Sequence, residues 1–205
     1  MTFRQLTAEH LDALREISNV GMGHAATALS QMVDDTIYLH VPKVSLADIA
    51  EVPDLMGGAD KVVVGVTLQI RGEATGTVLL VFPEESALRL ARRLLGRDEN
   101  APALDEMGIS TLKEVGNILA SSYLGAMGSL LHLSLLPSIP LLAHDMAGAV
   151  IDYLLIELSE TGNQALVIET EFHGKNPQES VIAGHFFLMP DPSSLEVLTG
   201  AIGAV

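Results

Sequence analysis

The sequence predicts a mixed α/β fold, α+β in type because its strands are antiparallel. Two halves related by a pseudo-two-fold axis, each with a long helix, antiparallel strands with a hairpin and a closing helix, share one core. Three observations predict this fold: an internal repeat, apolar spacing that alternates between helix and strand periods, and an apolar fraction of 48% over 205 residues. That fraction is sufficient for a buried core, and the chain has no cysteine that could form a disulfide.

The internal repeat is clearest in two helical segments. At an offset of 98 residues, identical side chains fall on one another: Glu16 on Glu114, Asn19 on Asn117 and Pro42 on Pro140. Farther along, residues 76–96 align with residues 183–203 at an offset of 107. We therefore predict a single domain over 1–205, whose first half is 1–98 and whose second half is 104–205.

Each half begins with a predicted helix. Thr7 can cap the first helix and Asp105 the second, because a side-chain oxygen at this position accepts a hydrogen bond from the first turn. Runs rich in aliphatic residues then predict strands over 36–41, 61–70 and 76–82 in the first half, and over 165–172 and 181–189 in the second. The last two strands of each half form a predicted hairpin, and a proline after each hairpin leads into a closing helix.

One segment of the second half is ambiguous. Residues 149–158 are nearly all apolar, and this pattern fits a buried helix or a buried strand equally well.

The charge of the chain excludes several classes of partner. A formal net charge of −15 and a sequence pI near 4.6 leave no basic footprint for nucleic acid or for an anionic membrane surface. The N-terminus is too charged for the apolar region of a signal peptide, and no apolar run is long enough to span a bilayer. We therefore expect a cytoplasmic protein.

A repeated polar stripe is the best candidate for chemistry. Asp12, Glu16 and Asn19 have the spacing i, i+4, i+7, which places them on one face of the first helix. Ser110, Glu114 and Asn117 repeat that spacing in the second helix. A solvated helix face explains most single Glu-x-x-Asn patterns. With the distant proline, however, the full pattern arises by chance on the order of once per 100,000 positions, and here it occurs twice.

The repeated Asp/Ser-x3-Glu-x2-Asn pattern and its proline resemble the signature of the CheC/CheX/FliY family of CheY-P phosphatases. Two intact copies are similar to the CheC branch of that family rather than to CheX, which carries one. The resemblance covers essentially the whole chain. His24 departs from the family pattern, which usually has Asn beside the site, and this departure bears on the docking of a partner.

The resemblance implies the hydrolysis of the phospho-aspartate of phosphorylated CheY. It implies that Asn19 and Asn117 orient an in-line water, and that Glu16 and Glu114 dock a lysine of the regulator. It also implies CheD as a further partner. No cofactor or metal of the chain's own is expected, because Mg²⁺ would arrive with the bound CheY.

Two alternatives to an enzyme are compatible with parts of the sequence. The first is a non-catalytic adaptor or scaffold that binds CheD or CheY, and intact Glu–Asn pairs argue against it because a scaffold has no need of a carboxamide that orients water. The second is a nucleotide site at Gly21-x-Gly23, but these glycines lie inside a predicted helix, where close approach of another helix or of a partner is the better explanation. The seven histidines show no metal-binding spacing.

Overall fold

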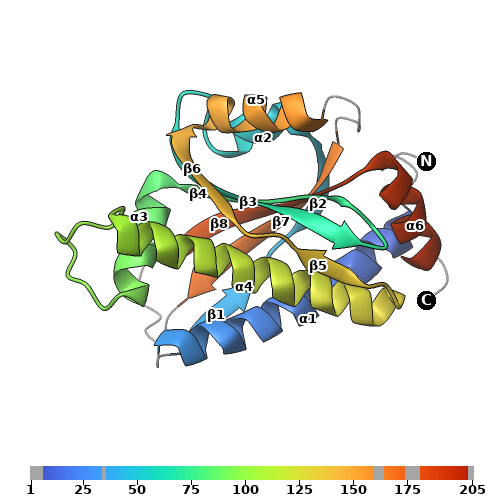
Figure 1. Cartoon of the computed structure of the whole chain (residues 1–205), viewed down its shortest axis with the longest axis horizontal. Coiled ribbons are helices and arrows are strands. Elements are labelled where there is room, and N and C mark those ends of the chain that lie inside the picture. Colours follow the sequence, from blue (N-terminus) through green and yellow to red (C-terminus); the bar gives the residue numbers. More distant parts are fainter. Residues whose placement is uncertain (1–6, 34–35, 159–163, 174–180, 203–205) are drawn as a thin grey trace.

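The computed structural model describes residues 7–33, 36–158, 164–173 and 181–202. Two long helices lie on one face of a curled antiparallel sheet and two shorter helices lie on the other face (Figure 1). The elements in chain order are α1 (Ala8–Val33), β1 (Tyr38–His40), β2 (Val44–Asp48), η2 (Ile49–Glu51), α2 (Val52–Leu55), β3 (Val62–Gly72), β4 (Gly76–Pro83), α3 (Glu84–Leu94), α4 (Glu106–Leu131), β5 (Leu135–Pro137), β6 (Leu141–Met146), α5 (Ala147–Leu158), β7 (Gln164–His173), β8 (Ile182–Pro190) and α6 (Pro192–Ile202).

Both predicted helix caps are confirmed. The backbone N–H of His10 donates to Thr7 Oγ1 over 3.3 Å, and the backbone N–H of Gly108 donates to Asp105 Oδ1 over 2.9 Å. Arg97 donates to the same carboxylate over 3.0 Å. This hydrogen bond, followed by that from Gly108, holds the pKa of Asp105 below its usual value. The ends of α1 and α4 therefore follow from local chemistry.

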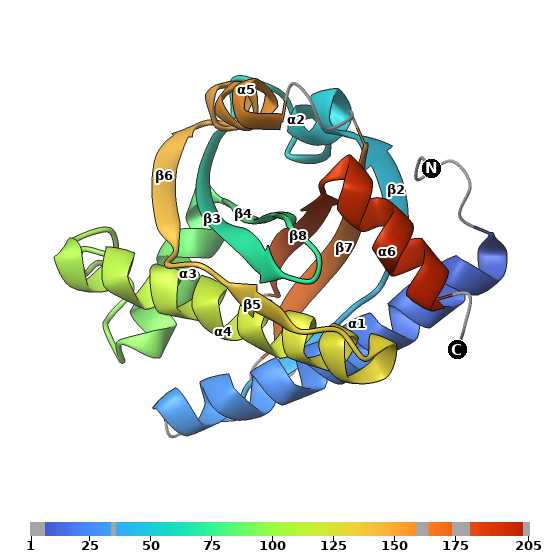
Figure 2. The ribbon, with the colours of Figure 1, turned by 45° about the vertical axis from the view of Figure 1, so that its right-hand side comes forward.

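The sheet has the order β1-β7-β8-β4-β3-β5, with β2 also paired to β7 and β6 also paired to β3 (Figure 2). The two predicted hairpins are confirmed as β3–β4 and β7–β8. Three strands were not predicted, namely β2, β5 and β6. Their segments, VSLAD, LLP and LLAHDM, lack the runs rich in β-branched and aromatic residues that marked the predicted strands. The ambiguous segment 149–158 is helical, within α5.

The edge strands of each half pair with the other half. β1 and β2 extend along β7, whereas β5 and β6 extend along β3. At the centre, β4 pairs with β8, and the register places Leu79 opposite Phe187 and Leu80 opposite Phe186. In the repeat offset of 107, Leu79 is equivalent to Phe186 and Leu80 is equivalent to Phe187. Exchanging the two halves therefore turns each of these contacts into the other, as a pseudo-two-fold axis between β4 and β8 requires. The division into 1–98 and 104–205 stays a prediction, but the two segments are interlocked in space.

The core has two parts, one on each face of the sheet. The larger part packs the sheet against α1, α3, α4 and α6, and the smaller part packs it against α2 and α5. Alternate residues of β4 enter the two parts, with Leu80 in the larger and Val81 in the smaller. Because both faces of the central strands are covered, β4 and β8 are apolar along nearly their whole length.

Among the residues that the structure describes, no helix is both long enough and apolar enough to cross a membrane.

Candidate active site

The candidate site is built on α1 and α4, which lie side by side and run antiparallel (Figure 1). They approach closely at Gly21, where an added Cβ would lie 2.8 Å from the Cα of Tyr123. Only a glycine permits this separation. The prediction that another helix approaches Gly21 closely is confirmed. At Gly23 an added Cβ would meet nothing within 4 Å, so that glycine is not required by packing.

The Tyr123 ring packs between the contact of the two helices and the sheet. It is fully buried and packs on Phe186 of β8, with ring centroids 5.1 Å apart. Burial raises the pKa of Tyr123, so its hydroxyl remains neutral in the folded protein. The helix pair is therefore held on the sheet by a large and uncharged contact.

Each polar stripe lies on the outer surface of its helix. Asp12, Glu16 and Asn19 are exposed on α1, whereas Leu14 and Ile17 between them are buried in the core. The second stripe lies similarly on α4. Ser110 and Glu114 are exposed there, and Asn117 is half-buried. Within each stripe, the Glu and the Asn are one turn apart on a rigid helix.

The structure keeps the two stripes apart. Because the helices are antiparallel and Gly21 faces Tyr123, Asn19 is level with Gly125 and Asn117 is level with Thr27. A rise of 1.5 Å per residue then separates the two asparagines by about 12 Å along the helix direction. The stripes therefore form two distinct sites on one surface.

The two repeated prolines lie in equivalent places at the sheet edges. Pro42 separates β1 from β2, and Pro140 directly precedes β6. A proline has no N–H to donate to a neighbouring strand, and edge strands are where such a residue is tolerated. Both prolines are half-buried.

The first site borders a groove between the two helices. The groove has a volume of about 820 Å³, and Glu16, Val20 and His24 of α1 line one of its sides. The opposite side is lined by small residues of α4, among them Ser121, Gly125 and Ser129.

The surroundings of the two sites are not identical. The repeat places Thr27 and Gln31 of α1 where α4 has Gly125 and Ser129, so the second site faces larger side chains. The groove was not predicted, and the sequence hints at it only through the concentration of small residues near Gly125.

Comparison with known proteins identifies the family. A model of the CheC-like family matches residues 9–46, which contain the first stripe and Pro42. A model of the chemotaxis phosphatase CheX matches residues 64–154, which contain the second stripe and Pro140. The CheY-P phosphatase CheC of Bacillus subtilis (strain 168) is 39% identical over 205 residues, and the alignment covers 98% of each chain. The chain belongs to the CheC-like family.

This CheC-like chain also resembles more distant relatives. CheC1 of Halobacterium salinarum is 26% identical over 168 residues, or 80% of this chain and 82% of that one. The crystal structure of Thermotoga maritima FliY has a TM-score of 0.77 at 20% identity, with 98% of each chain covered. These findings confirm the predicted family and the predicted fold class. The assignment of Glu16, Asn19, Glu114 and Asn117 to the active sites stays a prediction.

Proposed function

We propose that this CheC-like chain is a phosphatase that hydrolyses the phospho-aspartate of phosphorylated CheY at two sites, Glu16–Asn19 and Glu114–Asn117. The observation that carries the proposal is the pair of outward-facing Glu–Asn stripes at equivalent positions of α1 and α4. Support also comes from the full-length identity of 39% to a protein named as a CheY-P phosphatase.

The chemistry demands little of the chain beyond positioning. A phospho-aspartate is an acyl phosphate with a good leaving group, so its hydrolysis needs a water held in line with the scissile P–O bond. A carboxamide can orient that water, because its C=O accepts and its NH2 donates a hydrogen bond. This is the role we assign to Asn19 and Asn117. The asparagines remain neutral, so they do not repel the phosphoryl oxygens.

The glutamates fix the position of the regulator. Glu16 and Glu114 each lie one turn before the asparagine of their stripe, and both are exposed to an approaching protein. A carboxylate here accepts a charge-assisted hydrogen bond from a lysine of CheY and so sets the docking register. Mg²⁺ would be held by the regulator, and the reaction forms no covalent intermediate on this chain.

CheD stays a family-based prediction as a second partner. Binding of CheD is compatible with catalysis, because the two stripes occupy only part of the surface of α1 and α4. Co-purification of CheD with this chain, with and without CheY, would test it.

The proposal is tested by the decay of phosphorylated CheY in the presence of Mg²⁺. The wild-type chain is expected to accelerate decay. The double variant Asn19→Ala/Asn117→Ala is expected to lose about 100-fold or more of that acceleration, since the water is no longer held in line. Asn100→Ala is a matched control, because Asn100 is exposed in the link between α3 and α4 and is expected to leave the rate unchanged.

Two outcomes would contradict the proposal in different ways. If the wild-type chain fails to accelerate decay of its cognate regulator, the phosphatase is wrong and the adaptor alternative replaces it. If a folded double variant is as active as the wild type, the carboxamide mechanism is wrong, although the phosphatase stands.

A further inference from the structure

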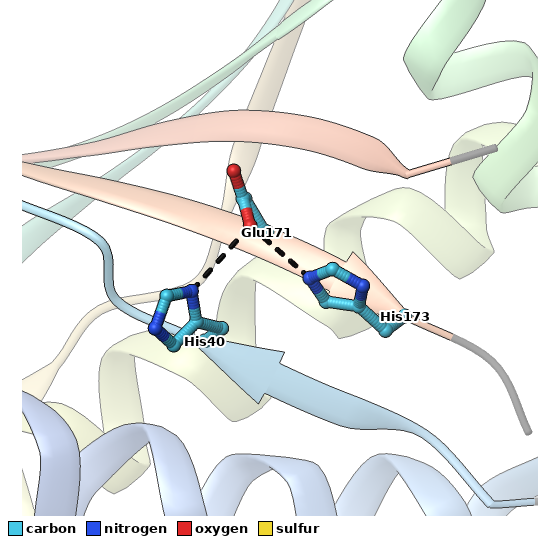
Figure 3. Close-up of side chains that lie close together, drawn as sticks. All are labelled: His40, Glu171 and His173. Carbon is cyan, nitrogen blue, oxygen red and sulfur yellow. Dashed lines mark hydrogen bonds and ion pairs between the residues drawn. The ribbon is translucent and has the colours of Figure 1, made fainter. Parts of the chain in front are cut away.

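A cluster of metal-binding side chains lies at the edge of the sheet, on strands β1 and β7. It consists of His40, Glu171 and His173 (Figure 3). His40 Nδ1 lies 3.4 Å from Glu171 Oε2, and His173 Nε2 lies 3.1 Å from the same oxygen. One ligand atom from each residue lies within 4.8 Å of the other two.

The strand register brings these side chains together. His40 of β1 is directly opposite Glu171 of β7, and His173 is two residues farther along β7, on the same face. Their neighbours Leu39 and Phe172 pack into the larger part of the core, beneath α1 and α4. The cluster therefore lies on the other face of the sheet, away from the two Glu–Asn stripes.

Two of the three separations between the potential ligand atoms match those of a tetrahedral metal site, and the third, between the two imidazole nitrogens, is within 4.8 Å. Ligand atoms about 2.0–2.1 Å from a zinc ion are about 3.3 Å apart at tetrahedral angles. The two separations from Glu171 Oε2, 3.4 Å and 3.1 Å, bracket that value. Both imidazole nitrogens approach one carboxylate oxygen, so the three potential ligands converge on one small volume.

An ordinary histidine–carboxylate pair in the same protein offers a contrast. His144 Nε2 of β6 lies 2.8 Å from Glu84 Oε1, and this contact involves one imidazole and one carboxylate. One hydrogen bond explains such a pair. Two imidazoles that approach one carboxylate oxygen form the His₂Glu set that zinc sites use.

We infer that His40, Glu171 and His173 bind a divalent transition-metal ion of the Zn²⁺ type, with a fourth position open to water. The set contains two imidazoles, which favour Zn²⁺, Co²⁺, Ni²⁺ or Cu²⁺ over Mg²⁺. The side chains are 63%, 36% and 37% exposed in the order His40, Glu171, His173, so an ion can enter from solvent.

The ion would cross-link the two halves of the chain. His40 belongs to the first half, whereas Glu171 and His173 belong to the second, and β1 is held at the sheet edge by only three register pairs with β7. An ion bound only by the folded protein stabilises that fold by mass action. The expectation that the chain has no metal of its own does not anticipate this cluster, since His40 and Glu171 are 131 residues apart and show no spacing motif.

The inference is tested by Zn²⁺ titration of the untagged full-length chain after treatment with a chelator. Calorimetry is expected to find one tight site, and Zn²⁺ is expected to raise the melting temperature. Glu171→Gln and His173→Gln are each expected to weaken binding at least about tenfold, because each removes a ligand. His144→Gln, the matched control, is expected to bind Zn²⁺ as the wild type does. An excess of Mg²⁺ should not compete.

The result that would overturn the inference is Zn²⁺ binding that is absent, or equally tight in the wild type and in the Glu171 and His173 variants. Circular dichroism of each variant without metal checks that it has folded. If a β7 variant fails to fold, His40→Gln replaces it, since the His40 side chain is largely exposed. The readout is binding, so its outcome is independent of the phosphatase assay.

Discussion

The glutamate and the asparagine of each stripe are neighbours on one helix face but differ in charge. Both lie on the surface of α1 or α4, where solvent screens their interactions until a partner covers them. A carboxylate gives a long-range attraction to a cation, whereas a carboxamide acts only through directed hydrogen bonds. We therefore expect the glutamates to affect mainly the binding of phosphorylated CheY, and the asparagines to affect mainly the rate of its hydrolysis.

The double variant Glu16→Gln/Glu114→Gln tests this separation. It is expected to raise the concentration of phosphorylated CheY that gives the half-maximal rate by several-fold to about tenfold, because each site loses one charge-assisted contact. The maximal rate should fall much less, and the salt dependence of the reaction should weaken. Steady-state kinetics at two ionic strengths measures all three quantities. A large fall in maximal rate with unchanged half-saturation would instead place the glutamates in the chemical step.

His185 predicts a pH dependence of stability. It lies on β8 opposite Glu169 of β7, and its ring stacks on Phe187 at a centroid distance of 6.1 Å. Burial lowers the pKa of His185 below the ordinary histidine value of about 6.5, and the Glu169 charge acts in the opposite direction. The unfolded chain therefore binds more protons just below pH 6.5 than the folded chain, so stability falls as the pH decreases through that value.

The measurement is urea unfolding at about pH 8 and at about pH 5.5, on either side of the ordinary histidine pKa. The loss of stability at the lower pH is expected to be smaller in His185→Phe than in the wild type. His132→Asn is the control, because His132 is exposed and has a φ of 56°, a conformation that asparagine tolerates. An identical pH dependence in wild type and His185→Phe would contradict the prediction.

At the scale of elements, the spacing of α1 and α4 determines where the two stripes lie. The helices are in contact at Gly21 and Tyr123, and the groove beside the first site exists because α4 presents small residues to α1. A change in helix spacing would therefore alter the sites without touching a stripe residue.

Gly21→Ala is expected to destabilise the protein by about 1–3 kcal/mol, because the new Cβ overlaps the backbone of α4. Gly23→Ala, two residues away in the same helix, is expected to be neutral or to stabilise by up to about 1 kcal/mol, since alanine favours a helix and nothing lies near its Cβ. Urea unfolding of both variants gives the comparison. Equal stability of the two would show that the helices do not pack as closely as described.

The elements also differ in how well the sequence predicted them. The caps at Thr7 and Asp105 and the two hairpins depend on neighbours close in sequence, and they were predicted correctly. The strands β2, β5 and β6 were missed because their own residues give no clear strand pattern, and each is completed by a partner strand in the other half of the chain. Their composition alone does not distinguish them from loops.

At the scale of the whole molecule, the exchange of edge strands makes the two halves depend on each other. The first half supplies β1 and β2 to β7, and the second half supplies β5 and β6 to β3. Without its counterpart, each half would leave an edge of its sheet unpaired and apolar surface exposed.

Fragments 1–98 and 99–205 test this dependence. Each fragment alone is expected to lack a cooperative unfolding transition, because its strands lose their partners across β4–β8 and at both edges. An equimolar mixture is expected to recover helix content and cooperative unfolding by circular dichroism. The intact chain under identical conditions is the control. Cooperative unfolding of either fragment by itself would contradict the prediction.

The amino-acid sequence was enough to predict the family, the fold class, the two long helices with their caps, and the polar stripes that we assign to catalysis. It could do so because helix periodicity and capping act over a few residues, and because the repeat displayed the Glu–Asn pairs twice. Three features became visible in the folded chain alone: the antiparallel packing that separates the stripes, the groove beside Glu16, and the contact of His40 and His173 with Glu171. These features depend on strand pairing and helix contacts between residues far apart in the chain, which leave no local pattern in the sequence.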